Sequence, residues 1–284
     1  MRDHAHEYSL AALSRVLRVT RAGYHAWQQR GRSARACAND ALRVEIRAIH
    51  AQSRGSYGCR RVRAVLRRQG HRVGRNRVAR LMAQEGLRAK RSRRFRVTTD
   101  SRSTRVVHDN LLARDFAVGT ANRAWAGDIT YLWTAEGWLY LAVVLDIGTR
   151  RVIGWSFRTT LEAELVTGAL NMALGARAVT EGLICHSDRG AQYGSEDVTA
   201  MLARFRLRGS MSRKGNCWDN AVAESFFASY KTELVAGADW QWRTEAKSAT
   251  VEWIEGWYNR TRLHSTLGYL SPDEFECQLA AKTQ

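Results

Sequence analysis

Apolar residues recur at helical spacing in the first part of the chain. Before residue 90 they lie three or four positions apart, as on one face of an α-helix, and polar or glycine-containing segments interrupt them. The pattern predicts short helices near residues 10–17, 20–27, 42–49, 62–66 and 75–82. We therefore expect an N-terminal region that is entirely helical.

After about residue 122 the pattern becomes that of a mixed α/β sheet. Residues 125–133 and 138–147 are rich in β-branched, aromatic and aliphatic side chains, and the residues between them are typical of a hairpin turn. The later segments predict strands at 152–159, 183–186 and 207–211, and helices at 161–177, 195–206, 219–234 and 244–258. Strands joined by hairpins and followed by alternating helices and strands indicate an α/β domain.

These patterns predict the organisation of the whole chain. We expect an N-terminal helical segment at 1–50, a basic pair of helices at 51–87, a basic linker at 88–121, and the α/β domain with a C-terminal helical extension at 122–284.

The positive charge is confined to the first part of the chain. The net charge is +18; residues 1–115 hold 28 Lys and Arg against 8 Asp and Glu, whereas the remainder holds 17 against 19. Codon bias in a GC-rich genome would explain why Arg outnumbers Lys forty to five, but not why acids are scarce before residue 116. The segregation predicts that the N-terminal region binds a nucleic acid.

A candidate DNA-binding helix pair lies within this charged region. Two helices joined by a short glycine-containing turn have the outline of a helix-turn-helix, whose second helix contacts DNA. An ordinary αα-hairpin with a solvated arginine face has the same periodicity, and the surrounding charge favours DNA binding. The arginines expected to contact DNA are Arg60, Arg61, Arg75, Arg77 and Arg80.

The sequence excludes several other classes of protein. No stretch approaches the roughly 18 apolar residues that a membrane span needs, and the polar N-terminus lacks the apolar core of a secretory signal. The five cysteines are odd in number, scattered and without a Cys-x-x-Cys pair, which argues against a disulfide framework and against a zinc site. We therefore expect a protein of the reducing cytoplasm.

Three carboxylates stand at positions where a charge is unexpected. Asp128 falls inside a predicted strand, Asp188 directly follows another, and Glu224 lies on a predicted helix. A charge within a strand is costly unless it is paired or binds a metal, and strand ends are where α/β folds place their chemistry. We take these three side chains as candidate catalytic and metal-binding residues.

The chemistry that suits three converging carboxylates is that of magnesium, which prefers oxygen ligands and keeps positions for water and phosphate. Two such ions about 4 Å apart serve phosphodiester chemistry. Asn220 and Lys231 share the helix face of Glu224, so we expect them to contact DNA. The thirty-five residues between Asp188 and Glu224 are weak support alone, because twelve Asp and fifteen Glu give roughly half such a pair by chance.

Two further positions have alternative interpretations. His186 could orient a phosphate, could support the carboxylates through a neighbouring residue, or could simply pack at the end of its strand. The run from Tyr258 to His264, with Arg262 in it, either contacts DNA through its basic and aromatic groups or folds back on the core.

Motifs in a fixed order make the chain recognisable along almost its whole length. They are Val19–Trp27, Tyr57-Gly58 with Arg60-Arg61, Trp125 with Asp128–Tyr131, His186–Gly190 with Gln192-Tyr193, Asp219–Ala221 with Glu224–Phe227 and Lys231, and Tyr258-Asn259, Arg262, His264-Ser265, Leu267–Tyr269 and Ser271-Pro272. Together they resemble the second-frame catalytic protein of insertion sequences of the IS3 family, within the DDE transposase and retroviral integrase group.

The resemblance implies an RNase H-like integrase catalytic core whose DDE triad falls on Asp128, Asp188 and Glu224. It implies a transposase that cleaves the 3′ end of its element and joins it to new DNA, with two Mg²⁺ ions per active site, for which Mn²⁺ would substitute. The implied partners are double-stranded DNA at the terminal inverted repeats and at the target, the first-frame OrfA protein or its frameshift fusion with this chain, and further copies of the chain assembled on DNA.

Two other functions remain compatible with the residues. A structure-specific nuclease of the same fold would cut without joining, and a non-catalytic DNA-binding regulator would occupy element ends. The intact set of three acids argues against the regulator, which has no need of them.

Overall fold

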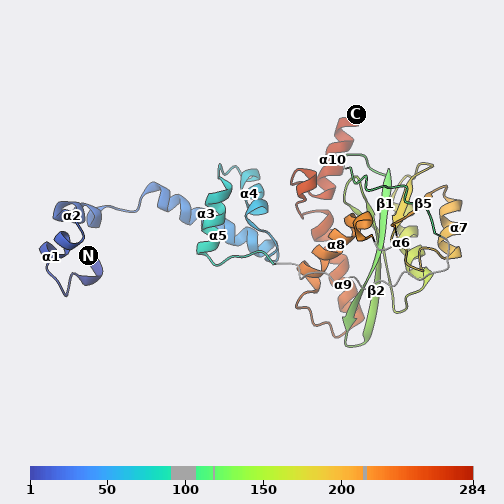
Figure 1. Ribbon diagram of the computed structural model, residues 1–284, viewed down its shortest axis with the longest axis horizontal. Coiled ribbons are helices and arrows are strands. Elements are labelled where there is room, and N and C mark those ends of the chain that lie inside the picture. Colours follow the sequence, from blue (N-terminus) through green and yellow to red (C-terminus); the bar gives the residue numbers. More distant parts are fainter. Residues whose placement is uncertain (91–106, 118, 214–215, 284) are drawn as a thin grey trace.

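The computed structural model describes residues 1–90, 107–117, 119–213 and 216–283. Figure 1 shows short N-terminal helices at one end, a group of helices in the middle, and a larger body built around a β-sheet. The elements of the first part are η1 (Arg2–His4), α1 (Leu10–Val16), α2 (Arg21–Gln29), α3 (Ala34–Gln52), α4 (Cys59–Arg68) and α5 (Arg75–Gln84).

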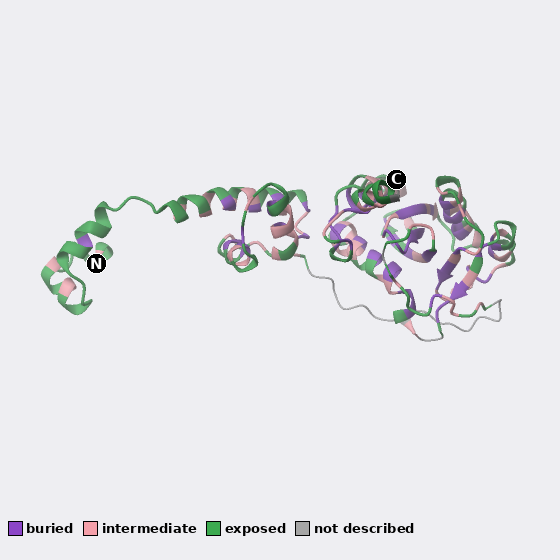
Figure 2. Cartoon of the chain, turned by 90° about the horizontal axis from the view of Figure 1, so that it is seen from above, coloured by how far each residue is buried: buried purple, intermediate pink, exposed green. Residues whose placement is uncertain are grey.

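The N-terminal helices begin at hydroxyl side chains. Ser9, Thr20 and Ser33 accept hydrogen bonds from backbone N–H groups in the first turns of α1, α2 and α3, which satisfies donors that a helix start leaves unpaired. Both α1 and α2 are mostly exposed and lie away from the rest of the chain (Figure 2).

Helices α3, α4 and α5 pack together, and we call them the helical unit. Ile46 and Ile49 of α3 share a buried core with Val62 of α4 and Val78 of α5. The boundary expected after residue 50 is therefore wrong, because it would cut through α3. The helical unit starts at α3, and the helix pair that we expected at 51–87 is its second half.

The rest of the chain from residue 107 surrounds the sheet, and we call it the sheet unit. Its elements are β1 (Ala124–Thr134), β2 (Gly137–Asp146), β3 (Val152–Arg158), α6 (Ala163–Ala176), β4 (Ile184–Ser187), α7 (Glu196–Arg204), β5 (Arg208–Met211), η2 (Cys217–Asn220), α8 (Ala221–Tyr230), η3 (Lys231–Val235), α9 (Arg243–Val251), η4 (Glu252–Asn259), η5 (Ser265–Leu267) and α10 (Pro272–Thr283). The expected mixed α/β domain is confirmed, and each predicted strand is present.

Within the described residues the strands form one five-stranded sheet in the order β3-β2-β1-β4-β5. The hairpin strands β1, β2 and β3 pair antiparallel, whereas β4 pairs parallel with β1 and with β5. The ladder between β1 and β4 is short and covers only Ala124–Ala126 of β1. This short pairing determines where the candidate site lies.

Helices cover both faces of the sheet. Helices α6 and α7 pack on one face over Trp125, Ala142 and Val144. On the other face, α8, α9 and η4 pack over Leu141 and Val143. Successive strand residues point to opposite faces, so Asp128 points to the face of α8.

The two long helices predicted near the C-terminus are each divided. The helix expected at 219–234 is a 3₁₀ turn, the α-helix α8 and the π-helical segment η3, and the one at 244–258 continues from α9 into the π-helical η4. Single π turns occur often at functional sites, and η3 begins at Lys231.

Part of the expected linker belongs to the sheet unit. The Leu111 backbone N–H donates to Ser210 Oγ at 2.9 Å, Leu112 is buried, and the His108 ring packs on Gly209 of β5. Arg114 forms an ion pair of 2.8 Å with Asp219. The segment 107–117 is therefore not a linker, and the expected linker residues 91–106 lie outside the described residues.

The helical unit contacts the C-terminal segment directly. The Leu263 backbone N–H donates to the Tyr57 hydroxyl at 2.7 Å, and Arg61 Nε donates to the Leu263 carbonyl at 2.9 Å. The Tyr57 and Trp257 rings lie 5.7 Å apart. Their side chains join one continuous hydrophobic core that extends from α3 to η4.

No helix in the ranges given above is both long enough and apolar enough to cross a membrane.

Replacing Asp219 should destabilise the fold in a pH-dependent way. Asp219 is fully buried and pairs with Arg213 and Arg114, and the hydrogen bond from Arg213 holds the pKa of its carboxyl well below the usual range. We expect Asp219→Asn to lower the free energy of unfolding at pH 7 by about 1–3 kcal/mol. A carboxyl with a depressed folded pKa stabilises above its unfolded pKa, near 3.8, and loses that contribution as the pH falls further.

The measurement is urea unfolding of both proteins between pH 7 and pH 3, where their difference should shrink toward the acid end. Glu181→Gln is the matched control, because its ion pair with Arg206 is 73% exposed on both sides and should contribute less than about 1 kcal/mol. An equal loss in both variants at pH 7 would contradict the structural role of Asp219.

Candidate active site

Asp128 and Asp188 lie side by side where two parallel strands separate. The last pair of residues between β1 and β4 is Ala126 with His186, and each aspartate follows two positions later on its own strand. Neighbouring strands are about 4.8 Å apart, so this register brings two carboxylates to the same point. Beyond it the edge of β1 has no strand partner on this side among the described residues.

A tight turn after β4 holds the Asp188 carboxylate. The Gly190 N–H donates to Asp188 Oδ1 at 2.9 Å. A Cβ atom at Gly190 would also lie 2.9 Å from this oxygen, which is too close. A side chain at position 190 would therefore displace the Asp188 carboxylate from this position.

The start of α8 brings Glu224 to the same place. Asn220, at the N-terminus of α8, donates from Nδ2 to the Gly127 carbonyl at 3.3 Å. This hydrogen bond joins α8 to β1 at the residue before Asp128. Glu224 then lies in the first turn of α8, half-buried and on the side of the sheet to which Asp128 points.

The electrostatics of Asp128 show that the three acids are close together. Burial, together with the negative charges of Asp188 and Glu224, raises its pKa to about 8, while the Ile129 N–H and Lys231 oppose the shift. Burial also raises the pKa of Asp188 and of Glu224. Three neighbouring carboxylates in a site partly shielded from solvent favour the binding of a cation.

Lys231 is a basic group that interacts with Asp128 in this cluster. Burial lowers the pKa of its ammonium, and the Asp128 carboxylate opposes that shift. The Nζ atom also lies 5.4 Å from the centre of the Tyr131 ring, a distance typical of a cation–π contact. The sequence prediction that Lys231 shares the site with Glu224 agrees with this geometry.

The donor set fits a hard divalent cation in its chemistry. All three side chains offer oxygen, retain part of their surface in contact with solvent and would lose their mutual repulsion on binding a positive ion. In the part of the chain that the structure describes, no group of three or more His, Cys, Asp or Glu side chains is already arranged to hold a metal ion. The carboxylates would therefore have to close on the ion as it binds.

Tyr193 is a site residue that the sequence analysis did not single out. Its buried ring lies on Gly127, where a Cβ atom would come within 3.0 Å of the ring and 3.1 Å of the hydroxyl. Burial, and then the charges of Asp128 and Asp188, raise the pKa of this hydroxyl well above its usual value. A glycine inside a strand often marks a close approach, so Gly127 was the available signal.

His186 is held within the sheet. It is fully buried, and its ring nitrogens lie 2.9 Å from Ser210 Oγ and 3.2 Å from Ser212 Oγ. Burial lowers its pKa to about 4, so the ring is neutral. These contacts favour the interpretation that His186 packs at the end of its strand. Any effect of His186 on Asp188 would act through the end of β4, which connects the two residues.

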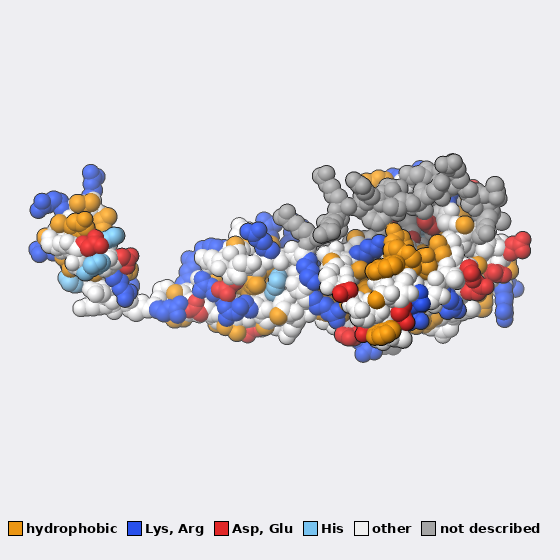
Figure 3. Space-filling model, turned by 90° about the horizontal axis from the view of Figure 1, so that it is seen from below, with side chains coloured by type: hydrophobic (Ala, Val, Ile, Leu, Met, Phe, Trp, Pro, Cys, Tyr) orange, Lys and Arg blue, Asp and Glu red, His pale blue; other side chains and the backbone are white. Residues whose placement is uncertain are grey.

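The arginines predicted to contact DNA fall into different environments. Arg60, Arg75 and Arg80 are exposed, and Lys and Arg side chains gather over the helical unit in the face that Figure 3 shows. Arg61, in contrast, is partly buried and donates to the Leu263 carbonyl. Arg77 donates to Asn39 Oδ1 of α3 at 2.9 Å. Arg61 and Arg77 thus hold the fold together, and the other three face solvent.

The prediction that Arg262 contacts DNA is wrong. Its side chain is only 5% exposed, forms a 2.9 Å ion pair with Glu233 and donates to Ser229 at 2.8 Å. Trp257 Nε1 also donates to Glu233, at 2.9 Å. Buried charges need such partners, so Arg262 serves to fold the C-terminal run back on the core. Asn220 is likewise 4% exposed, with its amide donating to Gly127.

Comparison with known proteins identifies both units. Residues 120–217 and 206–272 match integrase core domains, and residues 38–95 match an HTH-like domain. The Transposase InsF for insertion sequence IS3A of Escherichia coli strain K12 is 44% identical over 96% of this chain and 96% of its own length. The insertion element IS600 uncharacterized 31 kDa protein of Shigella sonnei is 42% identical over 93% of this chain and 97% of its own.

Among solved structures, the catalytic core domain of BIV integrase has 18% sequence identity and a TM-score of 0.44, and the match covers 57% of this chain and 99% of that one. The family rests on the sequence relatives, whose similarity extends over nearly the full chain and includes both the sheet unit and the helical unit. The chain belongs to the IS3 family of insertion-sequence transposases, with an integrase core domain and an HTH-like domain.

Proposed function

We propose that this transposase cleaves the 3′ ends of its element and joins them to new DNA at the site formed by Asp128, Asp188 and Glu224. The observation that carries this proposal is the placement of three mutually repelling carboxylates at the point where β1 and β4 separate. Water would attack the phosphodiester at the element end and release a 3′-hydroxyl, and this hydroxyl would then attack a phosphodiester of the target.

Asp128, Asp188 and Glu224 would hold two divalent ions, preferentially Mg²⁺. Such ions supply an activated oxygen nucleophile and stabilise the leaving oxygen. The role of the chain is to hold three carboxylates on three separate elements, the strand β1, the turn after β4 and the helix α8, so that their relative positions depend on the packing of the sheet.

Lys231 would hold the phosphate backbone of the strand that is cut, because its ammonium lies beside Asp128. Asn220 acts instead as a positioning residue, since its amide joins the start of α8 to β1. Its Oδ1 is buried and has no hydrogen-bond partner among the described residues. A small movement of α8 would let this oxygen accept a hydrogen bond.

The DNA partners are the terminal inverted repeats and the target duplex. Arg60, Arg75 and Arg80 are suited to phosphates, which position a protein on DNA without reading its sequence. We therefore propose that the first-frame OrfA protein, or its fusion with this chain, supplies sequence recognition, and that several copies assemble on DNA in the cytoplasm.

Each of Asp128→Asn, Asp188→Asn and Glu224→Gln should remove cleavage and joining but leave DNA binding intact. Each change removes one negative charge from the ion site while preserving the shape of the side chain. The loss of several kcal/mol of transition-state stabilisation corresponds to at least about a thousandfold in rate. The assay follows a labelled element end through cleavage and strand transfer, with OrfA present and absent.

Asp197→Asn and Glu196→Gln are matched controls, because both acids are exposed on α7. They should keep the wild-type rate. Near-full strand transfer by any one of the three site variants would show that its residue is not a metal ligand. Cleavage by the wild-type chain without joining would indicate the nuclease, and binding without cleavage would indicate the regulator.

The divalent ion should determine which steps occur. Mg²⁺ or Mn²⁺ should support cleavage and joining, whereas Ca²⁺ should support binding to DNA without turnover, because its longer and looser coordination does not suit in-line displacement. The measurement is the same end assay in each ion and in a chelator. Full activity in the chelator would overturn the proposed mechanism.

A further inference from the structure

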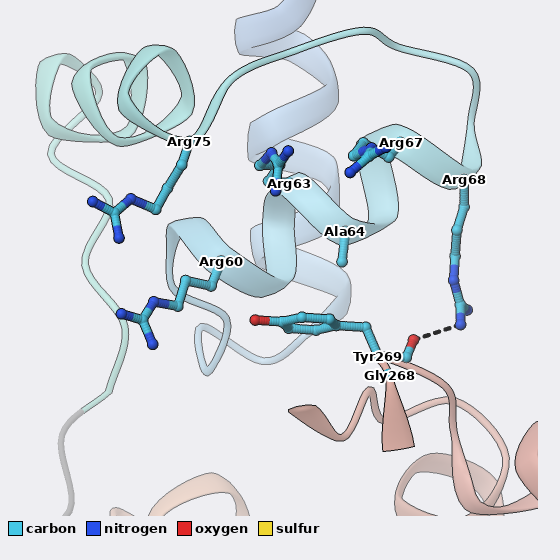
Figure 4. Close-up of a pocket in the computed structure, with 8 residues that line it drawn as sticks. All are labelled: Arg60, Arg63, Ala64, Arg67, Arg68, Arg75, Gly268 and Tyr269. Carbon is cyan, nitrogen blue, oxygen red and sulfur yellow. Dashed lines mark hydrogen bonds between the residues drawn. The ribbon is translucent and has the colours of Figure 1, made fainter. Parts of the chain in front are cut away.

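A cleft lined by arginines lies where the helical unit meets the C-terminal segment of the sheet unit (Figure 4). Its volume is about 460 Å³. One wall is α4 with the first residue of α5, and the other is the loop Gly268–Tyr269. The arginines that line it are Arg60, Arg63, Arg67, Arg68 and Arg75.

Two of these arginines are used to build the cleft. Arg68 forms a 3.0 Å ion pair with Glu274 and donates to the Tyr269 carbonyl, the hydrogen bond drawn in Figure 4. Arg63 donates to the Val73 carbonyl at 3.1 Å, in the loop before α5. The walls are therefore held together across the two units before any ligand binds.

The other three arginines have no protein partner within residues 1–90, 107–117, 119–213 and 216–283. Arg60, Arg67 and Arg75 are exposed, and none makes an ion pair or a side-chain hydrogen bond with any described residue. None of the described residues that line the cleft is acidic. Arginine carries donors that match phosphate oxygens, so three unpaired guanidinium groups around one cavity favour a phosphate ligand.

The arrangement suits a chain of phosphates better than a single anion. Arg60, Arg63 and Arg67 are spaced three and four residues apart on one face of α4 and extend along about 10 Å of helix. At the start of α5, beside Arg75, Gly74 provides no side-chain cap, and an uncapped helix N-terminus favours an anion.

The opposite wall has a fixed and unusual backbone. Gly268 and Tyr269 both adopt left-handed φ angles, of 66° and 65°, and the Tyr269 N–H donates to the His264 carbonyl at 2.8 Å. A left-handed conformation is uncommon for an aromatic residue. It places the Tyr269 ring against the cleft, below α4 (Figure 4).

We propose that this cleft binds the sugar–phosphate backbone of double-stranded DNA, and that DNA held there contacts the helical unit and the C-terminal segment at the same time. The inference deepens the proposed function by assigning a composite site to its DNA partner. Within the cleft, DNA contacts then come mainly from α4 and from the end of the sheet unit, and α5 contributes its first turn at Arg75.

The test is DNA binding by the full chain carrying Arg60→Ala, Arg67→Ala and Arg75→Ala together. Binding is measured in Ca²⁺ on end-containing and scrambled duplexes between 50 and 300 mM salt. Because this variant can no longer neutralise three of the DNA phosphates, the slope of log K against log salt should fall by about 2.7, and affinity near 0.1 M salt should fall by at least about tenfold. Both duplexes should be affected equally.

The matched control removes the same charge elsewhere. Arg158, Arg204 and Arg208 are exposed on β3, α7 and β5, and α7 and β5 lie on the far side of the sheet unit from α4 in Figure 1. Their triple alanine variant should retain the wild-type slope. An equal loss in both triple variants would show that only net charge matters, and an unchanged slope in the cleft variant would overturn the site.

Amide hydrogen exchange tests whether bound DNA also contacts the C-terminal wall of the cleft. DNA should slow exchange across residues 264–270 in the wild-type chain and not in the cleft variant; equal protection in both would overturn that part of the proposal. Because the binding and exchange measurements need no cleavage, they test the cleft even if the catalytic proposal fails. If the cleft variant cleaves and binds DNA as well as the wild-type chain does, the cleft proposal is refuted and the proposed catalytic function is not.

Discussion

The repulsion among Asp128, Asp188 and Glu224 is the interaction around which the sheet unit is arranged. The short ladder between β1 and β4 forces the two aspartates together, and the bond from Asn220 to the Gly127 carbonyl brings Glu224 to them. A fold gains nothing from such proximity in the absence of a cation, since burial and like charges both raise the pKa of Asp128. The unfavourable energy of this proximity is offset only when the carboxylates bind a cation.

A second constraint is the contact between the helical unit and residue 263. Tyr57 and Arg61 hold the backbone of Leu263 from both sides, and the next residue back, Arg262, is itself fixed by Glu233. Two arginines that sequence spacing assigned to DNA are therefore part of one structural connection. Arg60 is next to Arg61 on α4 but faces the cleft, because successive residues on a helix point in different directions.

Much of the fold and the candidate triad could be predicted from sequence because they depend on local patterns. Strand periodicity located β1 and β2, and each acid stood out in an apolar context. The family resemblance, confirmed by the relatives, gave the three acids their roles as an expectation. Tyr193 and Arg262 could not be assigned in this way: whether an aromatic ring or a guanidinium points inward depends on which distant element packs on it, here Gly127 and Glu233.

The separation of charge between the two parts of the chain follows from the chemistry of the site. Residues 116–284 hold 17 basic against 19 acidic residues, and the three carboxylates would repel a DNA phosphate that approached alone. Binding energy must then come from contacts distant from the reacting bond, which an enzyme can use to position a substrate against an unfavourable site. On the proposed function, the basic N-terminal part supplies such contacts, and its connection through Leu263 and Tyr269 to the sheet unit would let its attraction for DNA offset the repulsion between DNA and the carboxylates.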